Sequence, residues 1–531
     1  MGLIWTLDRR VHIQRIERLS CARGESLILK GSLLRSQDYQ TSCNARMAID
    51  THHPLQQSYD PLERRRNSFI ITSKSRLYNQ QFSKVYFLRL SQLRAILTEA
   101  CEGRWKDNKV CRVLDITPSG TSVVVGTIYC EMKLKPNVLD DLAREHHIGP
   151  VIGLRKWVTE NEDSVMLEDE SGRVRLVGLD RQRWCLVTGI TVGVLGRETS
   201  KGDFEVLDVV YAGPPPQHKP QTPPANQGLV AIVSGLDLDG NKSARATARC
   251  DALIEWLSGE VGGKEERMIA KSVGRLIIAG NLIWIPSSHD NRPNNDEKKP
   301  RRYGYDPSTY TGVPTDHADE VLSQLDLPVD LMPGPHDPTI QALPQQPLHK
   351  CLLPLANDSK GERNLVNGPN PWWAEIGGTT FLGTSGQNLD DIYKYVTHED
   401  RLQLAAQMLE WSHIAPTAPD TLWCYPFQEE DPFILTELPG VYFIGNQPKF
   451  ETKLVEFPSA KGDKKTRLIL VPRFSKSGTI VLVDPVTLKC QSVHLLRDLP
   501  KGLNDFDEED DGDEAMPEKI VMDVDADDED D

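Results

Sequence analysis

The sequence lacks the features of a secreted or membrane-spanning protein. Its ten cysteines are scattered, they form no C-x-x-C pair, and no secretory leader stands ahead of them, which is typical of proteins in a reducing compartment. No stretch of the chain approaches the roughly 20 consecutive apolar residues that a membrane-spanning helix needs. We therefore expect a soluble, intracellular protein.

The chain also lacks a basic excess, although its charge is distributed unevenly. The formal net charge is -16, but residues 505–531 hold 16 acidic residues and only one basic residue, Lys519, so the rest carries a charge of about -1. A protein that binds nucleic acid tightly by itself normally shows clustered Lys and Arg. A nearly neutral body neither indicates nor excludes contact with DNA, and we expect another component to hold it.

The length of 531 residues, with 39% hydrophobic residues, predicts two folded domains with irregular segments around them. Residues 1–36 are rich in Arg and apolar residues, as transit peptides are, and Met1, Gly2 and Thr6 fit the loose myristoylation pattern. Acidic residues interrupt the first segment, which weakens the transit-peptide interpretation. The myristoylation pattern is so short that it often matches by chance. A third interpretation is that the gene model extends too far upstream and that Met47 is the true start.

A helix followed by short strands opens the first domain. Residues 84–100 place Tyr86, Leu90, Leu93 and Leu97 on one helical face. Strands are expected at residues 123–129, in a hairpin over residues 165–177 that turns at Glu170, Ser171 and Gly172, and in a pair at residues 186–195 and 204–211. Short strands at this spacing predict an OB-fold, a five-stranded Greek-key barrel.

Such a barrel either binds single-stranded nucleic acid or packs on its neighbour as a structural unit. Single-strand binding needs exposed aromatic residues and a basic groove. The polar positions of these strands hold mostly Val, Thr, Gly and Asp, with no alternation of Arg and aromatic residues. The pattern favours a structural barrel.

A proline-rich linker and then an α/β pattern follow. Residues 212–227 contain six prolines, too many for a helix or sheet to continue. Residues 229–236 form a nearly continuous apolar strand, as parallel strands do. The elements expected beyond it are a helix burying Cys250, Leu253, Ile254 and Leu257, a strand at residues 275–283, and a further strand ending at Met332 after Val321, Leu322 and Leu325.

Two later regions have less specific patterns. Residues 287–315 form a polar loop whose basic knot, Lys298, Lys299, Arg301 and Arg302, is read as a solvated insertion rather than a phosphate contact. Residues 467–474 and 479–483 are expected to be strands of a second sheet.

Polar loops follow these strands at the spacing of binuclear phosphoesterases, whose metal ligands lie in D-x-H, G-D, G-N-H-D/E, a later His, and G-H-x-H. Two neighbouring divalent ions need carboxylates and imidazoles at those positions. The first motif is altered here, because Gly235 stands where Asp is needed and Asp237 where His is needed. In the second, Asn281 replaces the bridging Asp, and an amide carries no negative charge.

The remaining motifs are also incomplete. The third keeps His336 and Asp337, and His413 is a candidate for the later His. In the last, Asn446 and Pro448 replace both histidines. We therefore predict that the chain has no catalytic residues, no metal and no cofactor, and that the remaining His and Asp side chains only form hydrogen bonds at loop bends.

The same loops resemble one specific family, the small subunits of DNA polymerase delta. The segments that carry the resemblance are residues 233–236 (V-S-G-L), 276–282 (L-I-I-A-G-N-L), 329–339 (V-D-L-M-P-G-P-H-D-P-T), 343–354 (L-P-Q-Q-P-L-H-K-C-L-L-P), 381–388 (F-L-G-T-S-G-Q-N) and 413–427 (H-I-A-P-T-A-P-D-T-L-W-C-Y-P-F). Strings of this length, in this order, are far more specific than a short glycine motif. The resemblance covers about residues 67–500.

The resemblance implies an OB-fold joined to an inactive calcineurin-like phosphoesterase domain, a two-sheet α/β sandwich. It further implies a nuclear, non-catalytic scaffold for DNA replication and repair. The implied partners are the C-terminal domain of the polymerase catalytic subunit and a third subunit, with DNA contacted weakly or through the complex and no membrane contact. Trp372, Trp373, Trp423 and Tyr425 are candidates equally for core packing or for an interface.

The expected domain boundaries follow from these patterns. Residues 1–66 are an extension that is disordered or reflects a misassigned start, and residues 67–212 are the OB-fold domain with its leading helix. The linker covers residues 213–227, the phosphoesterase domain residues 228–500, and a disordered acidic tail residues 501–531. Two rival functions, an active metal-dependent phosphodiesterase and an independent single-strand binder, are disfavoured by the altered ligands and by the barrel's composition.

Overall fold

The computed structural model describes residues 57–72, 76, 81–118, 120–135, 156–159, 162–181, 183–218, 227–240, 245–284, 312–357, 365–458 and 464–495. The chain divides into two compact units, Met1–His53 and Pro54–Asp531, and only the second contains described residues. The myristoylation pattern, the Met47 start, the basic knot and the acidic tail all lie outside the described residues.

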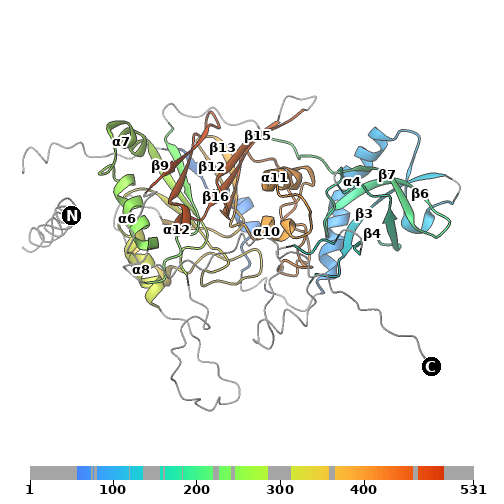
Figure 1. Ribbon diagram of the computed structural model, residues 1–531, viewed down its shortest axis with the longest axis horizontal. Helices are drawn as coiled ribbons and strands as arrows, with labels where there is room; N and C mark the ends of the chain where they lie inside the picture. The colour runs from blue at the N-terminus through green and yellow to red at the C-terminus, as the bar shows by residue number, and fades with distance from the viewer. Residues whose placement is uncertain are drawn as a thin grey trace, which may run out of the picture. The chain divides into compact units, whose positions relative to one another are not determined.

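The first domain is a closed β-barrel, as predicted (Figure 1). Its sheet has the order β2-β3-β4-β5-β7-β6, and β3 also pairs with β6, which closes the barrel. The strands are β2 (Val110–Cys111), β3 (Thr121–Glu131), β4 (Ser164–Glu168), β5 (Arg173–Val177), β6 (Thr191–Glu198) and β7 (Phe204–Val210), with a 3-10 turn at Val113–Asp115. The predicted hairpin and the predicted pair of strands are confirmed as β4–β5 and β6–β7.

Strand β6 begins later than the sequence pattern indicates. The apolar run from residue 186 predicts a strand there, but residues 187–190 form a turn. Gly189 has a positive φ of 90°, and its N–H donates to the carbonyl of Ile128 at 2.7 Å. The run is apolar because the turn is buried, not because it is a strand.

The leading helix α4 (Ser83–Arg104) packs on the barrel, as predicted. Leu90, Leu93 and Leu97 are buried against Val123 and Val125 of β3. Arg89 is also buried on this face. Neither this helix of 22 residues nor any other helix in the described ranges is long and apolar enough to cross a membrane.

The second domain contains two six-stranded sheets packed face to face, which confirms the predicted α/β sandwich (Figure 1). The first sheet has the order β11-β10-β9-β8-β17-β18 and the second β1-β12-β13-β14-β16-β15. Side chains from both sheets, including Ile232, Ile277, Trp372 and Phe443, form one core between them.

The strands of the first sheet are β8 (Leu229–Val233), β9 (Val273–Ala279), β10 (Val329–Met332), β11 (Leu365–Asn367), β17 (Thr479–Val483) and β18 (Cys490–His494). Those of the second are β1 (Tyr59–Asp60), β12 (Trp372–Ile376), β13 (Thr379–Thr384), β14 (Val441–Gln447), β15 (Glu451–Phe457) and β16 (Lys464–Pro472).

Helices cover the outer faces of both sheets. The first sheet carries α6 (Arg245–Leu257), α7 (Lys264–Lys271) and α8 (Val313–Leu322), and the second carries α10 (Gln387–Tyr393) and α11 (Arg401–Glu410). The remaining short helical turns are α3 (Glu63–Ser68), Lys350–Leu352, α9 (Pro354–Asn357) and α12 (Phe474–Ser477). Helix α8 begins inside the loop that the sequence predicts to end at residue 315.

The placement of the last two predicted strands needs correction. Both were expected in the second sheet, but only β16 lies there, whereas β17 pairs antiparallel with β8 in the first sheet. Helix α12 and Gly478, at φ 61°, carry the chain from one sheet to the other. Both strands are buried on two faces, so their apolar runs contain no signal for sheet membership.

The predicted N-terminal extension ends earlier than residue 66. Residues 57–72 form a strap in which β1 pairs antiparallel with β12 at an edge of the second sheet. Tyr59 of the strap donates to Asp330 of the first sheet at 2.9 Å. Arg275 lies 3.7 Å above the Tyr59 ring and 2.7 Å from the buried Asp330 carboxylate. The strap therefore joins the two sheets.

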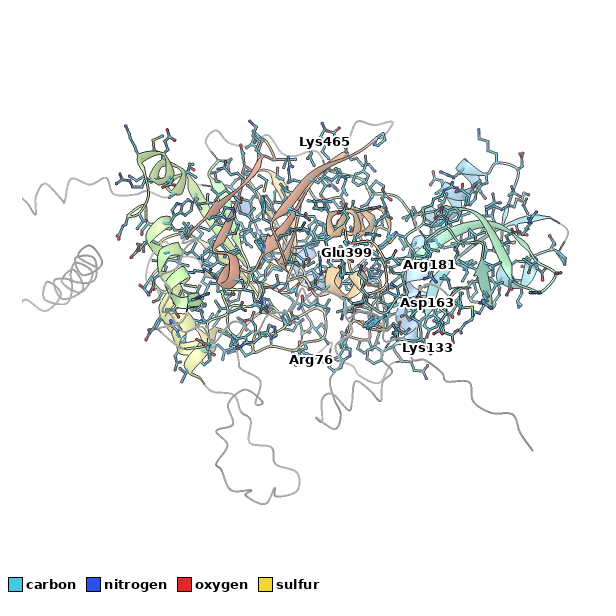
Figure 2. The ribbon with its side chains drawn as sticks, viewed as in Figure 1. Arg76, Lys133, Asp163, Arg181, Glu399 and Lys465 are labelled. Carbon is cyan, nitrogen blue, oxygen red and sulfur yellow. The ribbon has the colours of Figure 1, made fainter. Side chains whose placement is uncertain are left out.

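The linker is docked where the structure describes it, at residues 212–218 and 227. Ser412 donates to the carbonyl of Gly213 at 2.6 Å, and Lys464 donates to that of Pro214 at 2.8 Å. Gln217 exchanges hydrogen bonds with the backbone of Lys465, which is labelled in Figure 2. These contacts hold the start of the linker against the second domain.

Replacing Tyr59 by Ala should destabilise the second domain by about 2–4 kcal/mol, because the change removes a hydrogen bond to a buried carboxylate and a cation–π contact. Tyr59→Phe, the matched control, keeps the ring and should lose less. Denaturant titration of the full chain measures both. Equal midpoints for Tyr59→Ala and wild type would show that the strap adds no stability.

Candidate functional site

The carboxyl ends of the central strands of both sheets meet at one edge of the sandwich. Strands β8, β9 and β10 are parallel, as are β13, β14 and β16. The two sets are joined where the N–H of Asn446 donates to Ser234 Oγ at 2.9 Å and where Arg473 pairs with Ser234 in an isolated bridge. The loops here form the strand-end cluster, which consists of Gly235, Asp237, Asn281, Trp284, His336, Asp337, Asn446 and Arg473.

Three non-glycine residues of the strand-end cluster adopt the left-handed backbone conformation. Asp237, Asn281 and Asn446 have φ values of 51°, 54° and 56°. Asn and Asp are the non-glycine residues that reach this region most readily. The backbone alone is therefore one physical reason for these residue types at the strand ends.

The Asp237 carboxylate is already paired within the chain. Arg473 Nη2 lies 3.2 Å from Asp237 Oδ1, and the Ser475 hydroxyl donates to Asp237 Oδ2. The guanidinium of Arg473 also lies 5.5 Å from the ring centre of Trp284, and that ring is 4.6 Å from the ring of His336. One carboxylate, one cation and two rings thus form a series of successive contacts.

Asp337 is turned toward backbone N–H groups. Its carboxylate accepts from Gly334 at 2.7 Å and from Ile283 at 3.0 Å. Burial raises the pKa of Asp337 to about 7, against the opposing effect of these hydrogen bonds. The side chain fastens the loop after β10 to the loop after β9.

Neutral amides lie within the strand-end cluster and next to it. Asn281 Oδ1 accepts the N–H of His336 at 3.2 Å, and Asn446 Nδ2 donates to the carbonyl of Ser385 at 2.8 Å. Asn370 donates to both Gln345 and Gln387, at 2.9 and 3.1 Å. Asn370, Gln345 and Gln387 thus bond to one another, and none of these amides carries a net charge.

The structure brings together six of the eight predicted positions and separates one. Gly235, Asp237, Asn281, His336, Asp337 and Asn446 share contacts in the strand-end cluster, and Pro448 follows it as an exposed residue. His413 forms a different set of contacts. Its Nδ1 accepts from the N–H of Ala415 at 3.2 Å, and its Nε2 lies 2.9 Å from Asp431.

His413 and Asp431 belong to a buried junction between the two domains, centred on Arg89 of helix α4. Arg89 Nε lies 2.9 Å from Asp431 Oδ2, and its Nη atoms donate to the carbonyls of Gly189, Pro416 and Ala418 at 2.7–2.9 Å. The side chains of Arg89 and Asp431 are 0% exposed. One side chain thus joins α4, the barrel and two loops of the second domain.

Sequence reasoning missed Arg89, although a signal was present. Val85, Arg89, Leu93 and Leu97 recur at intervals of four, so the arginine lies on the apolar face of its helix. A charged residue at such a position has to find a buried partner.

Comparisons with known proteins agree with this architecture. A family model described as DNA polymerase delta subunit OB-fold domain matches residues 81–209, and one that describes the B subunits of DNA polymerases alpha and epsilon matches residues 230–452. The DNA polymerase delta small subunit of Arabidopsis thaliana is 37% identical, covering 84% of this chain and 98% of its own length. The chain belongs to the DNA polymerase delta small subunit family.

Other relatives in this family span several kingdoms. The small subunit of Saccharomyces cerevisiae is 36% identical over 82% of this chain and 93% of its own, and subunit 2 of Drosophila melanogaster is 35% identical over 80% and 96%. A match to a solved archaeal phosphodiesterase covers 50% of this chain and 99% of that protein, at 12% identity and a TM-score of 0.24.

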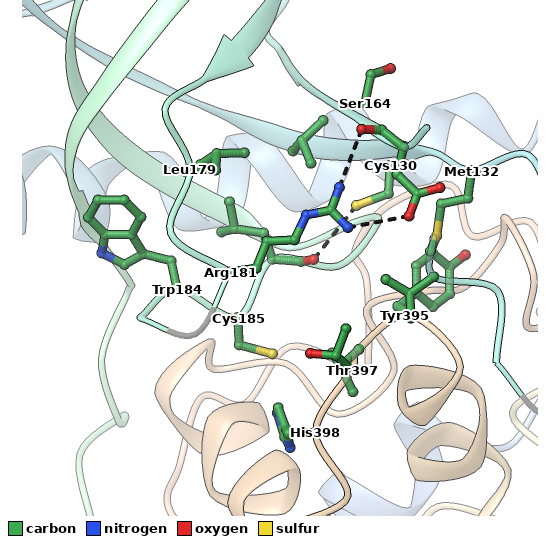
Figure 3. Close-up of a pocket in the computed structure, with 15 residues that line it drawn as sticks. Cys130, Met132, Ser164, Leu179, Arg181, Trp184, Cys185, Tyr395, Thr397 and His398 are labelled. Carbon is green, nitrogen blue, oxygen red and sulfur yellow. Dashed lines mark hydrogen bonds and ion pairs between the residues drawn. The ribbon is translucent and has the colours of Figure 1, made fainter. Parts of the chain in front are cut away.

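In this small-subunit chain, a cavity of about 40 Å³ lies at the domain junction (Figure 3). Met132, Leu179 and Trp184 line it from the barrel, and Tyr395 and His398 from the second domain. Figure 2 labels Arg181 and Asp163 on the barrel side and Glu399 on the other. The cavity has room for a few water molecules at most, so it is a packing gap between domains.

Replacing Arg89 by Met should lower the stability of the folded chain by about 3–5 kcal/mol, since Asp431 and three carbonyls lose a buried partner. Arg94→Met on the same helix, whose partner Glu170 is exposed, is the matched control and should cost less than about 1 kcal/mol. Denaturant titration and limited proteolysis of the full chain measure the difference. Similar midpoints for both variants would contradict the role given to Arg89.

The junction should also lose stability as the pH falls. Burial and the neighbouring Arg89 lower the pKa of His413 to about 4, below its unfolded value near 6.5. A lowered folded pKa gives stability that is complete above about pH 6.5 and lost as the pH falls through about 4. The melting temperature of wild type should therefore fall more steeply between these values than that of His413→Gln. Parallel curves for the two proteins would refute the assignment.

Proposed function

We propose that the protein is the non-catalytic scaffold subunit of a DNA polymerase delta complex. It joins the C-terminal domain of the catalytic subunit to a third subunit in nuclear DNA replication and repair synthesis. Family membership supports the complex, and one observation supports the non-catalytic role: both carboxylates of the strand-end cluster are already engaged within the chain.

A two-metal phosphoesterase centre needs anionic ligands that bridge and neutralise two divalent cations. Of the eight predicted positions, only Asp237 and Asp337 carry a carboxylate. Asp237 faces a guanidinium, and Asp337 faces backbone N–H groups. Among the described residues, no three His, Cys, Asp or Glu side chains are arranged to hold a metal ion. The engagement of both carboxylates supports the proposal that the chain holds no two-metal centre.

A scaffold has to present its binding surfaces in a fixed geometry. The Arg89 junction ties helix α4 and the barrel to the loops that carry Pro416 and Ala418. The docked start of the linker adds contacts at Gly213 and Pro214. Two domains fixed in this way lose little conformational freedom when partners bind, which favours affinity.

The charges on the barrel support weak DNA contact at most. Several arginines on the barrel and α4 form ion pairs, which reduces the positive charge that they can offer to a phosphate backbone. These pairs are Arg94–Glu170, Arg104–Asp208, Arg183–Asp208, Arg112–Asp115, Arg173–Glu168 and Arg197–Glu205.

The aromatic candidates for an interface separate into two groups. Trp372, Trp373 and Tyr425 are buried, whereas Trp423 is 46% exposed. Tryptophan is enriched at the centres of protein interfaces. We propose that Trp423 contacts a protein partner.

Affinity isolation of the tagged full chain from nuclear extract at moderate salt tests the proposed function. We expect near-equimolar recovery of a family B polymerase catalytic chain and a third subunit. Recovery of the chain alone, together with bound Mn or Fe and cleavage of a phosphodiester, would replace the scaffold with an enzyme.

The same isolation tests Trp423. Trp423→Ala should keep the melting temperature of wild type but recover less of one partner, by at least about tenfold if the side chain is a hot spot. Val486→Ala, a change at another exposed apolar residue, is the matched control. Full recovery with Trp423→Ala would remove this residue from the interface.

A further inference from the structure

The strand-end cluster contains a built-in positive charge, carried by Arg473. We infer that Arg473 is the counter-cation of Asp237 and takes over, from within the chain, the charge balance that a bound cation would otherwise supply. The inference rests on the proposed loss of two-metal chemistry, but not on which partners the protein binds.

The backbone delivers Arg473 to this position. Strand β16 ends at Pro472. The backbone of the residues that follow is hydrogen-bonded to the loop after β8. The N–H of Phe474 donates to the carbonyl of Ser234 at 2.7 Å, and that of Ser475 donates to the carbonyl of Gly235 at 2.9 Å. These bonds hold the backbone of Arg473 beside the loop after β8. The side chain of Arg473 is therefore within reach of Asp237.

Gly235 leaves the room that the arginine uses. A Cβ built on Gly235 would lie 3.0 Å from both Cβ and Cγ of Arg473 and 2.9 Å from Asn446 Oδ1. A metal-binding aspartate at residue 235 would therefore compete with Arg473 for the same space. Because Gly235 has no side chain, the side chain of Arg473 can occupy the space beside it.

The guanidinium is held on more than one side. Asp237 and Arg473 are 10% and 21% exposed, so water screens their pairing less than at an open surface. The centre of the Trp284 ring lies 5.5 Å from the guanidinium carbon of Arg473, and the His336 ring packs on the Trp284 ring. A cation fixed here also repels any divalent ion that approaches the same carboxylate.

A double-mutant cycle on the purified full chain tests the pairing. Arg473→Met and Asp237→Asn should each lower the melting temperature, by about 2–4 °C, because each leaves one charge unpaired. The double variant should lie closer to wild type than the sum of the two losses. Arg473→Lys should recover part of the loss, because it keeps the charge. Arg197→Met, at an exposed pair, is the control.

Two results would overturn the inference. Additive losses in the cycle would show that Arg473 and Asp237 do not act as a pair, and Arg473→Lys as unstable as Arg473→Met would show that charge is not the operative property. Addition of 1 mM Mn²⁺, about the scale of weak sites, should leave the wild-type melting temperature unchanged. A rise that Asp237→Asn abolishes would equally refute it. All these readouts are independent of partner recovery.

Discussion

The buried guanidinium of Arg89 is the interaction on which the two-domain arrangement depends. It donates to Asp431 and to three backbone carbonyls, one in the barrel and two in the second domain. A buried charge is costly unless each of its donors finds an acceptor in the right place. Because its acceptors come from both domains, Arg89 ties the barrel to the sandwich in the arrangement that the structure shows.

The partners of Arg89 are themselves held in one chemical state. Because the N–H of Ala415 donates to His413 Nδ1, the ring proton lies on Nε2 and points to Asp431. Arg89 and His413 keep the pKa of Asp431 well below its usual range despite burial. Backbone contact completes the junction, since a Cβ on Gly189 would collide with the carbonyl of Pro416. Charge pairing and close backbone approach therefore specify the same arrangement.

The sequence was sufficient for the elements with a clear period or a clear turn. The helix at residues 84–100, the hairpin at residues 165–177 and strand β17 all lie where periodicity and turn residues put them. It was insufficient where burial on both faces erases the period, as for the sheet membership of β17 and the start of β6. The strap is a third case, because its two-residue strand β1 is stabilised only by distant partners such as Asp330.

The residues of the candidate site were likewise predicted from the sequence only in part. Spacing after apolar strands correctly grouped Asp237, Asn281, His336 and Asn446, because parallel strands deliver their carboxyl ends to one edge. It could not separate His413, which follows helix α11 rather than a strand and finds its partners across the domain junction. Nor could it find Arg473, whose relation to Asp237 exists only after two sheets have met.

The two charge centres of the molecule represent opposite solutions to the same physical problem. At the domain junction, a fully buried arginine donates to one carboxylate and three backbone carbonyls and joins the barrel to the second domain. At the strand ends, a partly exposed arginine balances one carboxylate amid neutral amides. The strand-end loops of the sandwich thus contain their own cation and their own hydrogen-bond partners. These internal contacts support the proposal that the protein is a scaffold rather than an enzyme.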